Sequence, residues 1–139
     1  MKKWIALCFA ALLIASPSAF AEQAPDSFTV EIICESEDIY QLYYACYQGD
    51  SCQGLGGVAD PDGQALSPDT PLTVTFPSSY FDDPTDLEDF GIALSPYGRD
   101  DLTAITTTDP LIFPAEFGGH YTVVLSGDRE SGFQVTLAE

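Results

Sequence analysis

Apolar and polar residues alternate with a period of two along much of this chain, and this pattern constrains the fold more than any other feature. Alternation of this kind is typical of strands with one face on a core and the other in water. Clusters of Gly, Pro, Asp and Ser separate the alternating runs. We therefore expect an all-β fold, a small antiparallel β-sandwich or barrel. The clearest alternating runs are 28–34, 72–76, 90–95, 121–126 and 133–137.

The segment 37–48 admits two interpretations. Ile39, Leu42 and their apolar neighbours recur at helical spacing, which predicts one short helix. Tyrosines also alternate through the segment, and tyrosine favours strands. We prefer the strand and keep the helix as the alternative. The Gly-, Pro- and Asp-rich stretch 53–69 predicts a loop that contains a short strand at 57–59.

Four tyrosines lie within residues 40–47, before Cys52, and a strand at this place must divide them between its two faces. Two of them would then face the core, and two would be free to form an exposed patch. Tyrosine gives contact area at a low cost in entropy and is enriched in protein interfaces. The four are Tyr40, Tyr43, Tyr44 and Tyr47.

The beginning of the chain has the features of a cleavable secretory signal peptide, which we assign to residues 1–21. Lys2 and Lys3 precede the apolar run 4–15, which is too short to span a bilayer as a stable helix. Small residues at positions 19 and 21 fit a signal peptidase site. We expect residues 22–139 to form a single acidic domain in the periplasm, with secretion as the alternative. No later segment is apolar enough to cross a membrane.

Charge is distributed very unevenly. All 22 acidic residues follow Ala21, but only Arg99 and Arg129 of the four basic residues do, so the expected mature chain has a net charge of 2 − 22 = −20. Such a field repels nucleic acid and anionic lipid and attracts cationic partners. We expect a basic protein as partner, with no nucleic acid and no membrane contact after cleavage. Solubility alone is the alternative explanation of the charge.

Three cysteines follow the expected signal peptide. An exported protein meets oxidising conditions, so at least one disulfide is expected. We favour Cys46–Cys52, which would close a short loop, and keep a pairing with Cys34 as the alternative. The spacing is not that of paired zinc ligands, and the chain has one histidine.

The residues do not indicate a catalytic centre, and we expect no enzymatic activity and no cofactor. Any histidine-based triad must use His120, and no serine or cysteine near it has a recognisable nucleophile setting. Two aspartate-rich turns offer oxygen ligands for calcium, but their spacing is that of no known loop motif. A metal site is therefore a weak alternative, and its ligands would be Asp60, Asp62, Asp82, Asp83 and Asp86.

Two motifs in the second half of the chain resemble a known pattern. Residues 88–98 combine an acidic residue, an alternating strand and a Pro-x-Gly turn, and residues 113–125 add Phe-x-Ala and then Gly-x-Tyr-x-Val-x-Leu. Their order is similar to that of the bacterial pre-peptidase C-terminal type of β-sandwich, a module of secreted proteins. Among small stand-alone proteins, the chain resembles the periplasmic inhibitors of goose-type and invertebrate-type lysozymes. Those have a signal peptide, a comparable length and a β-sandwich.

The lysozyme inhibitors carry a Ser-Gly-x-Tyr-like motif on a loop that enters the lysozyme cleft. Gly118-Gly119-His120-Tyr121 stands at that place here, and Gly118 replaces the serine. The resemblance implies a periplasmic lysozyme inhibitor that blocks the cleft with this loop, assisted by a facing turn. The partner-binding residues would be Gly118, Gly119, His120, Tyr121, Tyr97, Arg99 and Asp100.

Two rival functions stay open. A periplasmic immunity protein against a delivered toxin would use the same compartment and the same blocking mechanism. A calcium-binding surface or adhesion module would use the acidic loops instead. Open edge strands or an unpaired cysteine also leave a homodimer open.

Overall fold

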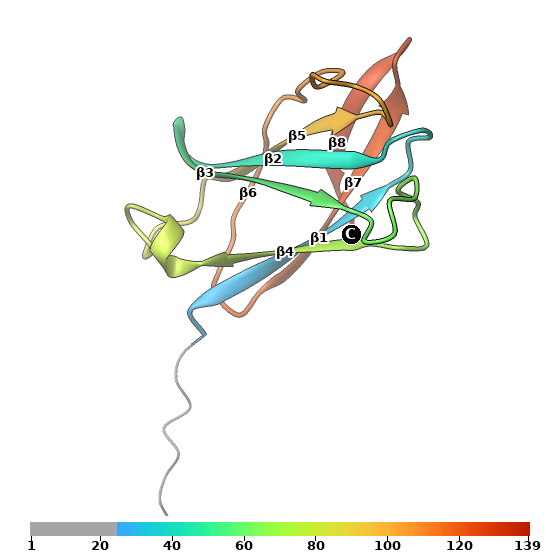
Figure 1. Ribbon diagram of the computed structural model, residues 1–139. Coiled ribbons are helices and arrows are strands. Elements are labelled where there is room, and N and C mark those ends of the chain that lie inside the picture. The colour runs from blue at the N-terminus through green and yellow to red at the C-terminus, as the bar shows by residue number, and fades with distance from the viewer. Residues whose placement is uncertain (1–24) are drawn as a thin grey trace, which may run out of the picture.

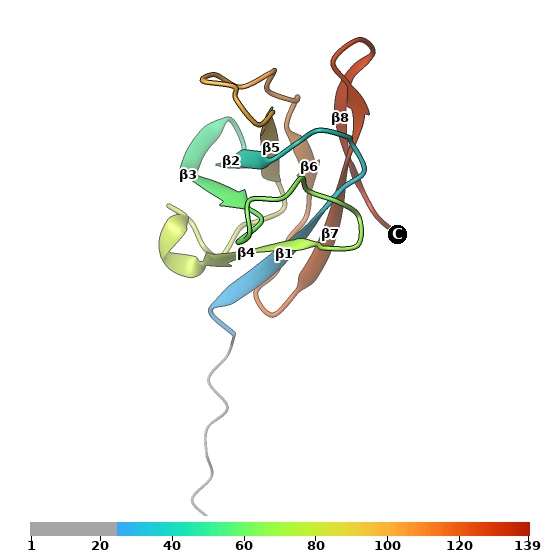
Figure 2. The same cartoon turned by 45° about the vertical axis from the view of Figure 1, so that its right-hand side comes forward.

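The computed structural model describes residues 25–139, so the predicted signal peptide, residues 1–21, lies outside the described residues. Two four-stranded sheets pack face to face (Figures 1 and 2). The single helical element of this part is a short 3-10 turn, η1, and no helix there is long and apolar enough to cross a membrane. The elements are β1 (Ser27–Cys34), β2 (Gln41–Gln48), β3 (Ser51–Ala59), β4 (Leu72–Pro77), η1 (Ser78–Tyr80), β5 (Phe90–Tyr97), β6 (Leu111–Phe113), β7 (His120–Asp128) and β8 (Gly132–Leu137).

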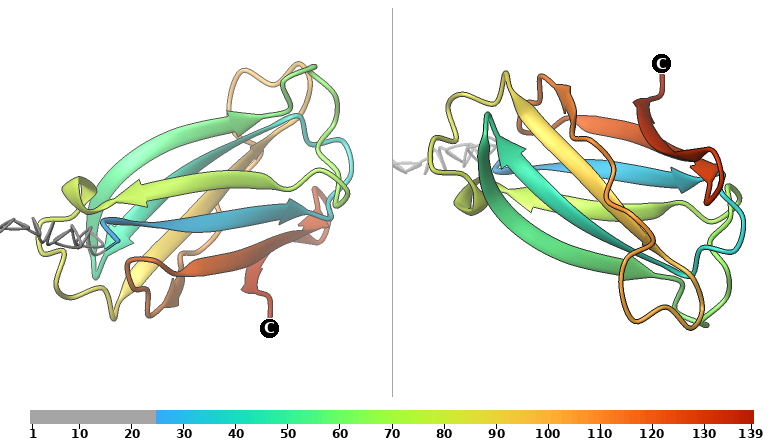
Figure 3. Two further views of the ribbon diagram at one scale, coloured as in Figure 1. Left: turned by 90° about the horizontal axis from the view of Figure 1, so that it is seen from below. Right: turned by 90° about the horizontal axis from the view of Figure 1, so that it is seen from above.

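The first sheet has the strand order β4-β1-β7-β8 and the second sheet β3-β2-β5-β6. Figure 3 shows the first sheet in front on the left and the second in front on the right. The prediction of an all-β sandwich is confirmed. It is wrong in one detail, because β1 and β7 pair in parallel, with Val30 opposite Tyr121. Parallel neighbours need a crossover connection, and here that connection includes β4 and all four strands of the second sheet.

Alternating side chains of both sheets form the core between them. Phe28, Val30, Ile32 and Cys34 of β1 are each at most 2% exposed, as their period of two predicts. One end of this core is aromatic, with the Phe28 ring at its centre. Its centroid lies 5.0–6.0 Å from the ring centroids of Phe76, Phe81, Phe90, Phe117 and Tyr121.

The hairpin of β2 and β3 resolves the ambiguous segment 37–48. Its larger part is the strand β2, so the short-helix alternative is wrong. The strand β3 is longer than predicted, because residues 54–56, expected in a loop, pair with β2. A β-carbon on Gly56 would overlap the hydroxyl group of Tyr44. Glycine therefore stands in this edge strand because aromatic side chains of the neighbouring strand cover it.

The predicted Cys46–Cys52 disulfide is not formed, and neither is the alternative with Cys34, since all three thiols are free. The register of the hairpin explains this outcome. Cys46 pairs with Gly54 and points into the core, whereas Cys52 pairs with Tyr47 and is exposed. Burial, followed by the nearby thiol of Cys52, raises the pKa of Cys46 to about 11, which makes it a poor nucleophile.

Candidate functional site

The predicted partner-binding motif begins in the connection from β6 to β7, which we call the β6–β7 loop (residues 114–120). The loop lies against the first residues of β1. The N–H of Gly118 donates to the Ser27 carbonyl at 2.8 Å, and the Thr29 N–H donates to the Gly119 carbonyl at 3.1 Å. The side chains of His120 and Thr29 also form a hydrogen bond. The loop is therefore fixed to the adjacent strand along its second half.

Glycine is required at both positions of the Gly118-Gly119 pair. Gly118 has a φ of +87°, which other residues rarely adopt. A β-carbon on Gly119 would lie 2.7 Å from the hydroxyl oxygen of Tyr121 and 2.9 Å from the Glu116 carbonyl oxygen. The pair thus closes a tight turn, in which the Gly119 N–H donates to that carbonyl at 3.0 Å.

Tyr121 holds the β6–β7 loop in place through its hydroxyl group and its ring. Its hydroxyl oxygen accepts a hydrogen bond from the Glu116 N–H at 2.9 Å, like a tyrosine corner in other β-sandwiches. Its half-buried ring packs against Phe28 and Phe113, at centroid distances of 5.9 and 5.2 Å. Both ends of this side chain are therefore committed within the molecule. The exposed residues of the loop are Pro114 at its start and then Glu116, Gly118 and His120.

The structure does not bring Tyr97, Arg99 and Asp100 together with this loop. Phe90, at the start of β5, packs 5.2 Å from Phe113 and so marks the end of the sandwich that holds the loop. Tyr97 is the last residue of the same strand. Seven steps of about 3.3 Å each separate the two ends by about 23 Å. The facing turn expected from the sequence is therefore at the opposite end of the molecule.

Tyr97 and Arg99 instead contact two tyrosines of the segment 40–47, and the sequence did not predict these contacts. The Tyr97 and Tyr43 rings lie 5.1 Å apart, inclined by 57°. The Arg99 guanidinium lies 4.7 Å above the Tyr40 ring and donates to its hydroxyl at 3.1 Å. The tyrosine-rich composition of 40–47 was the sequence feature that could have indicated this cluster. The pairing of β2 with β5 is what brings Tyr97 next to these tyrosines.

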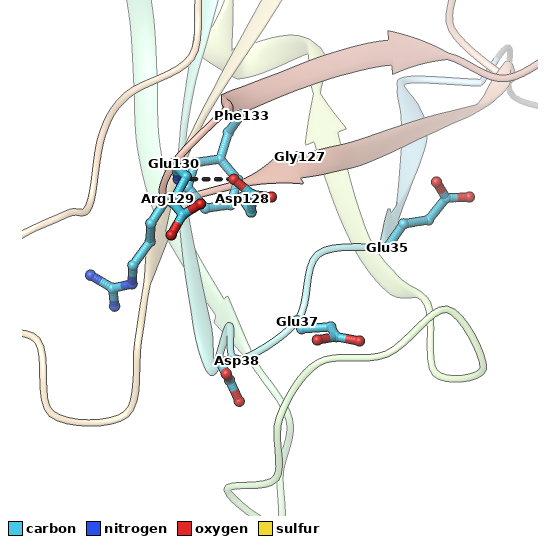
Figure 4. Close-up of a pocket in the computed structure, with 8 residues that line it drawn as sticks. All are labelled: Glu35, Glu37, Asp38, Gly127, Asp128, Arg129, Glu130 and Phe133. Atoms are coloured by element: carbon cyan, nitrogen blue, oxygen red, sulfur yellow. Dashed lines mark hydrogen bonds between the residues drawn. The ribbon is translucent and has the colours of Figure 1, made fainter.

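A hollow of about 500 Å³ lies beside the β7–β8 hairpin and is lined mainly by acidic residues (Figure 4). Its one cation, Arg129, extends away from the Asp128 carboxylate and forms an ion pair with Asp101, at 2.7 Å. The Gly98 N–H and this arginine hold the pKa of Asp101 below its usual value. The residues that line the hollow are Glu35, Glu37, Asp38, Gly127, Asp128, Arg129, Glu130 and Phe133.

The candidate calcium ligands serve the turns in which they lie. Asp60 accepts hydrogen bonds from the N–H groups of Asp62 and Gln64, and Asp83 accepts two from Thr85. Within residues 25–139, no group of three or more His, Cys, Asp or Glu side chains is arranged to hold a metal ion. The remaining candidates, Asp82 and Asp86, contact Gln53 and the N–H of Glu88.

A comparison of the sequence with protein-family models and with curated proteins finds no match. The resemblance to lysozyme inhibitors therefore rests on the motif itself.

Proposed function

We propose that this protein is an exported inhibitor of a lysozyme, and that the β6–β7 loop blocks the enzyme's cleft. The observation that carries the proposal is the bracing of this loop from two sides. Strand β1 holds its second half through Ser27 and Thr29, and the Tyr121 hydroxyl holds Glu116. A loop that is already ordered loses little conformational entropy on binding, which favours affinity.

The charge of the chain supports a basic target. A net charge of −20 on the expected mature chain accelerates encounter with a cationic surface and is weakened by salt. His120, the first residue of β7, is exposed and bonds Thr29 through Nδ1, so Nε2 is the ring atom that it offers to the catalytic carboxylates of a lysozyme. Glu116, also exposed, would meet basic residues at the rim of the cleft.

The braced loop changes the role expected for Tyr121. Its hydroxyl and ring are occupied inside the molecule, so we assign it to positioning the loop. Direct contact with the enzyme falls to Glu116, Gly118 and His120. Tyr97, Arg99 and Asp100, at the far end of β5, are outside this contact.

Inhibition of goose-type, invertebrate-type and chicken-type lysozymes, measured by clearing of a cell-wall suspension, tests the proposal. Two charge-reversal variants distinguish direct contact of the loop with the enzyme from attraction by the overall negative charge. Glu116→Lys changes the loop, whereas Glu37→Lys makes the same change in net charge at the opposite end of β1, also on an exposed residue. We expect Glu116→Lys to weaken inhibition by about tenfold more than Glu37→Lys, the loss typical of one interface contact.

Two results would count against the proposal. If the two variants weaken inhibition equally, charge alone matters and the loop is not the contact. If the protein inhibits no lysozyme but neutralises a toxin delivered into the periplasm, the immunity function replaces inhibition.

A further inference from the structure

The outer face of the second sheet is uncharged, in a chain that is otherwise strongly acidic. The pairing registers place one set of alternating side chains of β2, β3, β5 and β6 on this face, opposite the core. Leu55, Ile112 and Tyr43 are 76%, 57% and 44% exposed. Gly91 and Ala93 of this face are buried, so its accessible part lies over β2, β3, the end of β5 and β6. The residues of the uncharged face are Gln41, Tyr43, Ala45, Tyr47, Cys52, Leu55, Gly57, Ala59, Gly91, Ala93, Ser95, Tyr97 and Ile112.

The first sheet shows what an ordinary outer face looks like in the same protein. There the outward positions are mainly polar, among them Thr29, Glu31, Thr73 and Thr75, and the paired Ile33 and Val124 are apolar exceptions. Antiparallel sheets usually have such a polar solvent face. Exposed apolar surface bordered by polar residues, in contrast, marks an interaction site. The second sheet therefore departs from the pattern in the direction expected of an interface.

Acidic residues stand at the ends of the strands that form the uncharged face. Each lies within three residues of a strand end, and Arg99 adds one cation at a corner, already held over Tyr40. A charge-free aromatic centre with a charged rim is the usual anatomy of a protein interface. The acidic residues at these ends include Asp50, Asp60, Asp89, Asp100 and Asp109.

The anchors of this face are held in place before any partner binds. Tyr43 lies over Gly57, where an added β-carbon would come within 3.1 Å of its ring, and packs against Tyr97 on its other side. Rigid tyrosines lose little entropy on binding and are frequent interface hot spots. Leu55 projects beside them from the edge strand β3.

The negative charge around the uncharged face determines which kind of partner can bind there. A second copy would bring two carboxylate rims together, and an anionic membrane would be repelled. The 57° inclination of the Tyr43 and Tyr97 rings does not offer the flat platform on which sugar rings stack. We propose that the uncharged face docks a protein that presents an apolar patch bordered by lysine and arginine. This surface is separate from the β6–β7 loop and does not depend on lysozyme inhibition.

Photocrosslinking in the native host tests the proposal with the full chain. A benzoylphenylalanine residue replaces Leu55 or Tyr43 on the uncharged face, or Thr75 on the outer face of the first sheet as control. We expect adducts at positions 55 and 43 and none at position 75, with a partner that mass spectrometry identifies as a protein of net positive charge. Added salt should reduce the adduct yield, because the rim attraction is screened. Glu116→Lys should leave the adducts unchanged.

Four outcomes would overturn the proposal: no adduct at positions 55 and 43, equal adducts at position 75, an adduct with a second copy of the chain, or an adduct with an acidic protein or a glycan. Circular dichroism of each labelled protein shows whether it is folded. If a labelled position disturbs folding, Leu55→Ser in the chain labelled at position 43 provides the second reading. This variant should lose that adduct, and its retention would also overturn the proposal.

Discussion

Replacing Tyr121 by phenylalanine separates the two things this residue does. The change removes the hydroxyl that accepts the Glu116 N–H at 2.9 Å and keeps the ring that packs against Phe28 and Phe113. If the loop is braced as described, Tyr121→Phe should loosen the β6–β7 loop and leave the aromatic end of the core intact.

The size of the effect follows from the surroundings of the bond. A neutral hydrogen bond contributes about 1 kcal/mol to stability, and an N–H left buried without a partner costs more. Glu116 is exposed, so water can take the place of the lost acceptor, and we expect a loss of about 0.5–1 kcal/mol. Tyr121→Ala also removes the half-buried ring and should cost about 2–3 kcal/mol, less than the truncation of a fully buried aromatic residue.

Urea unfolding gives the global free energy, and hydrogen exchange of the Glu116 amide reports the loop itself. We expect faster exchange at Glu116 in Tyr121→Phe and weaker lysozyme inhibition, with the midpoint of unfolding only slightly lowered. Unchanged exchange at Glu116 would refute the bracing role. A loss of stability as large as that of Tyr121→Ala would show that the hydroxyl and the ring do not act separately.

Three further predictions follow from the hairpin and the ion pair. Gly56→Ala should destabilise the protein by about 1–3 kcal/mol, since the added methyl group overlaps the Tyr44 hydroxyl, and thermal unfolding measures the loss. A thiol reagent at pH 8, read by peptide mass spectrometry, should label Cys52 in the native protein and the buried Cys46 only after unfolding; protection of both would indicate a disulfide. The pKa of Asp101 is lowered by its backbone N–H donor and its arginine partner, so the stability it adds is present above about pH 4 and lost as the pH falls through the lowered value. The free energies of unfolding of Asp101→Asn and of the parent protein, measured across pH, should therefore differ at neutral pH and converge in strong acid.

The strands of the core could be predicted from the sequence because their inward residues alternate without interruption. Phe28 to Cys34 in β1 is an example, with each inward residue nearly inaccessible to solvent. Only residues 57–59 of strand β3 were predicted as strand. The rest was missed because glycines interrupt its side-chain pattern, and their role is visible only when Tyr43 and Tyr44 lie across them. The parallel pairing of β1 with β7 joins residues about 90 positions apart, beyond the reach of any local pattern.

The candidate site could be predicted in part. The loop around Gly118 is where the motif puts it, and its closing turn is explained by the positive φ of that glycine. The grouping with Tyr97 failed because sequence order does not say which end of a strand faces which loop. The uncharged face needed the register of β2 with β5, which brings tyrosines from two distant segments together.

The most direct test of the central claim is a titration of goose-type and invertebrate-type lysozymes with the purified protein, followed by cell-wall clearing at low and high salt. The account predicts a stoichiometric loss of lysozyme activity at low salt, and a weaker loss at high salt because salt screens the attraction between the acidic protein and the enzyme. Full lysozyme activity in a molar excess of the folded protein, with every lysozyme tested, would contradict it.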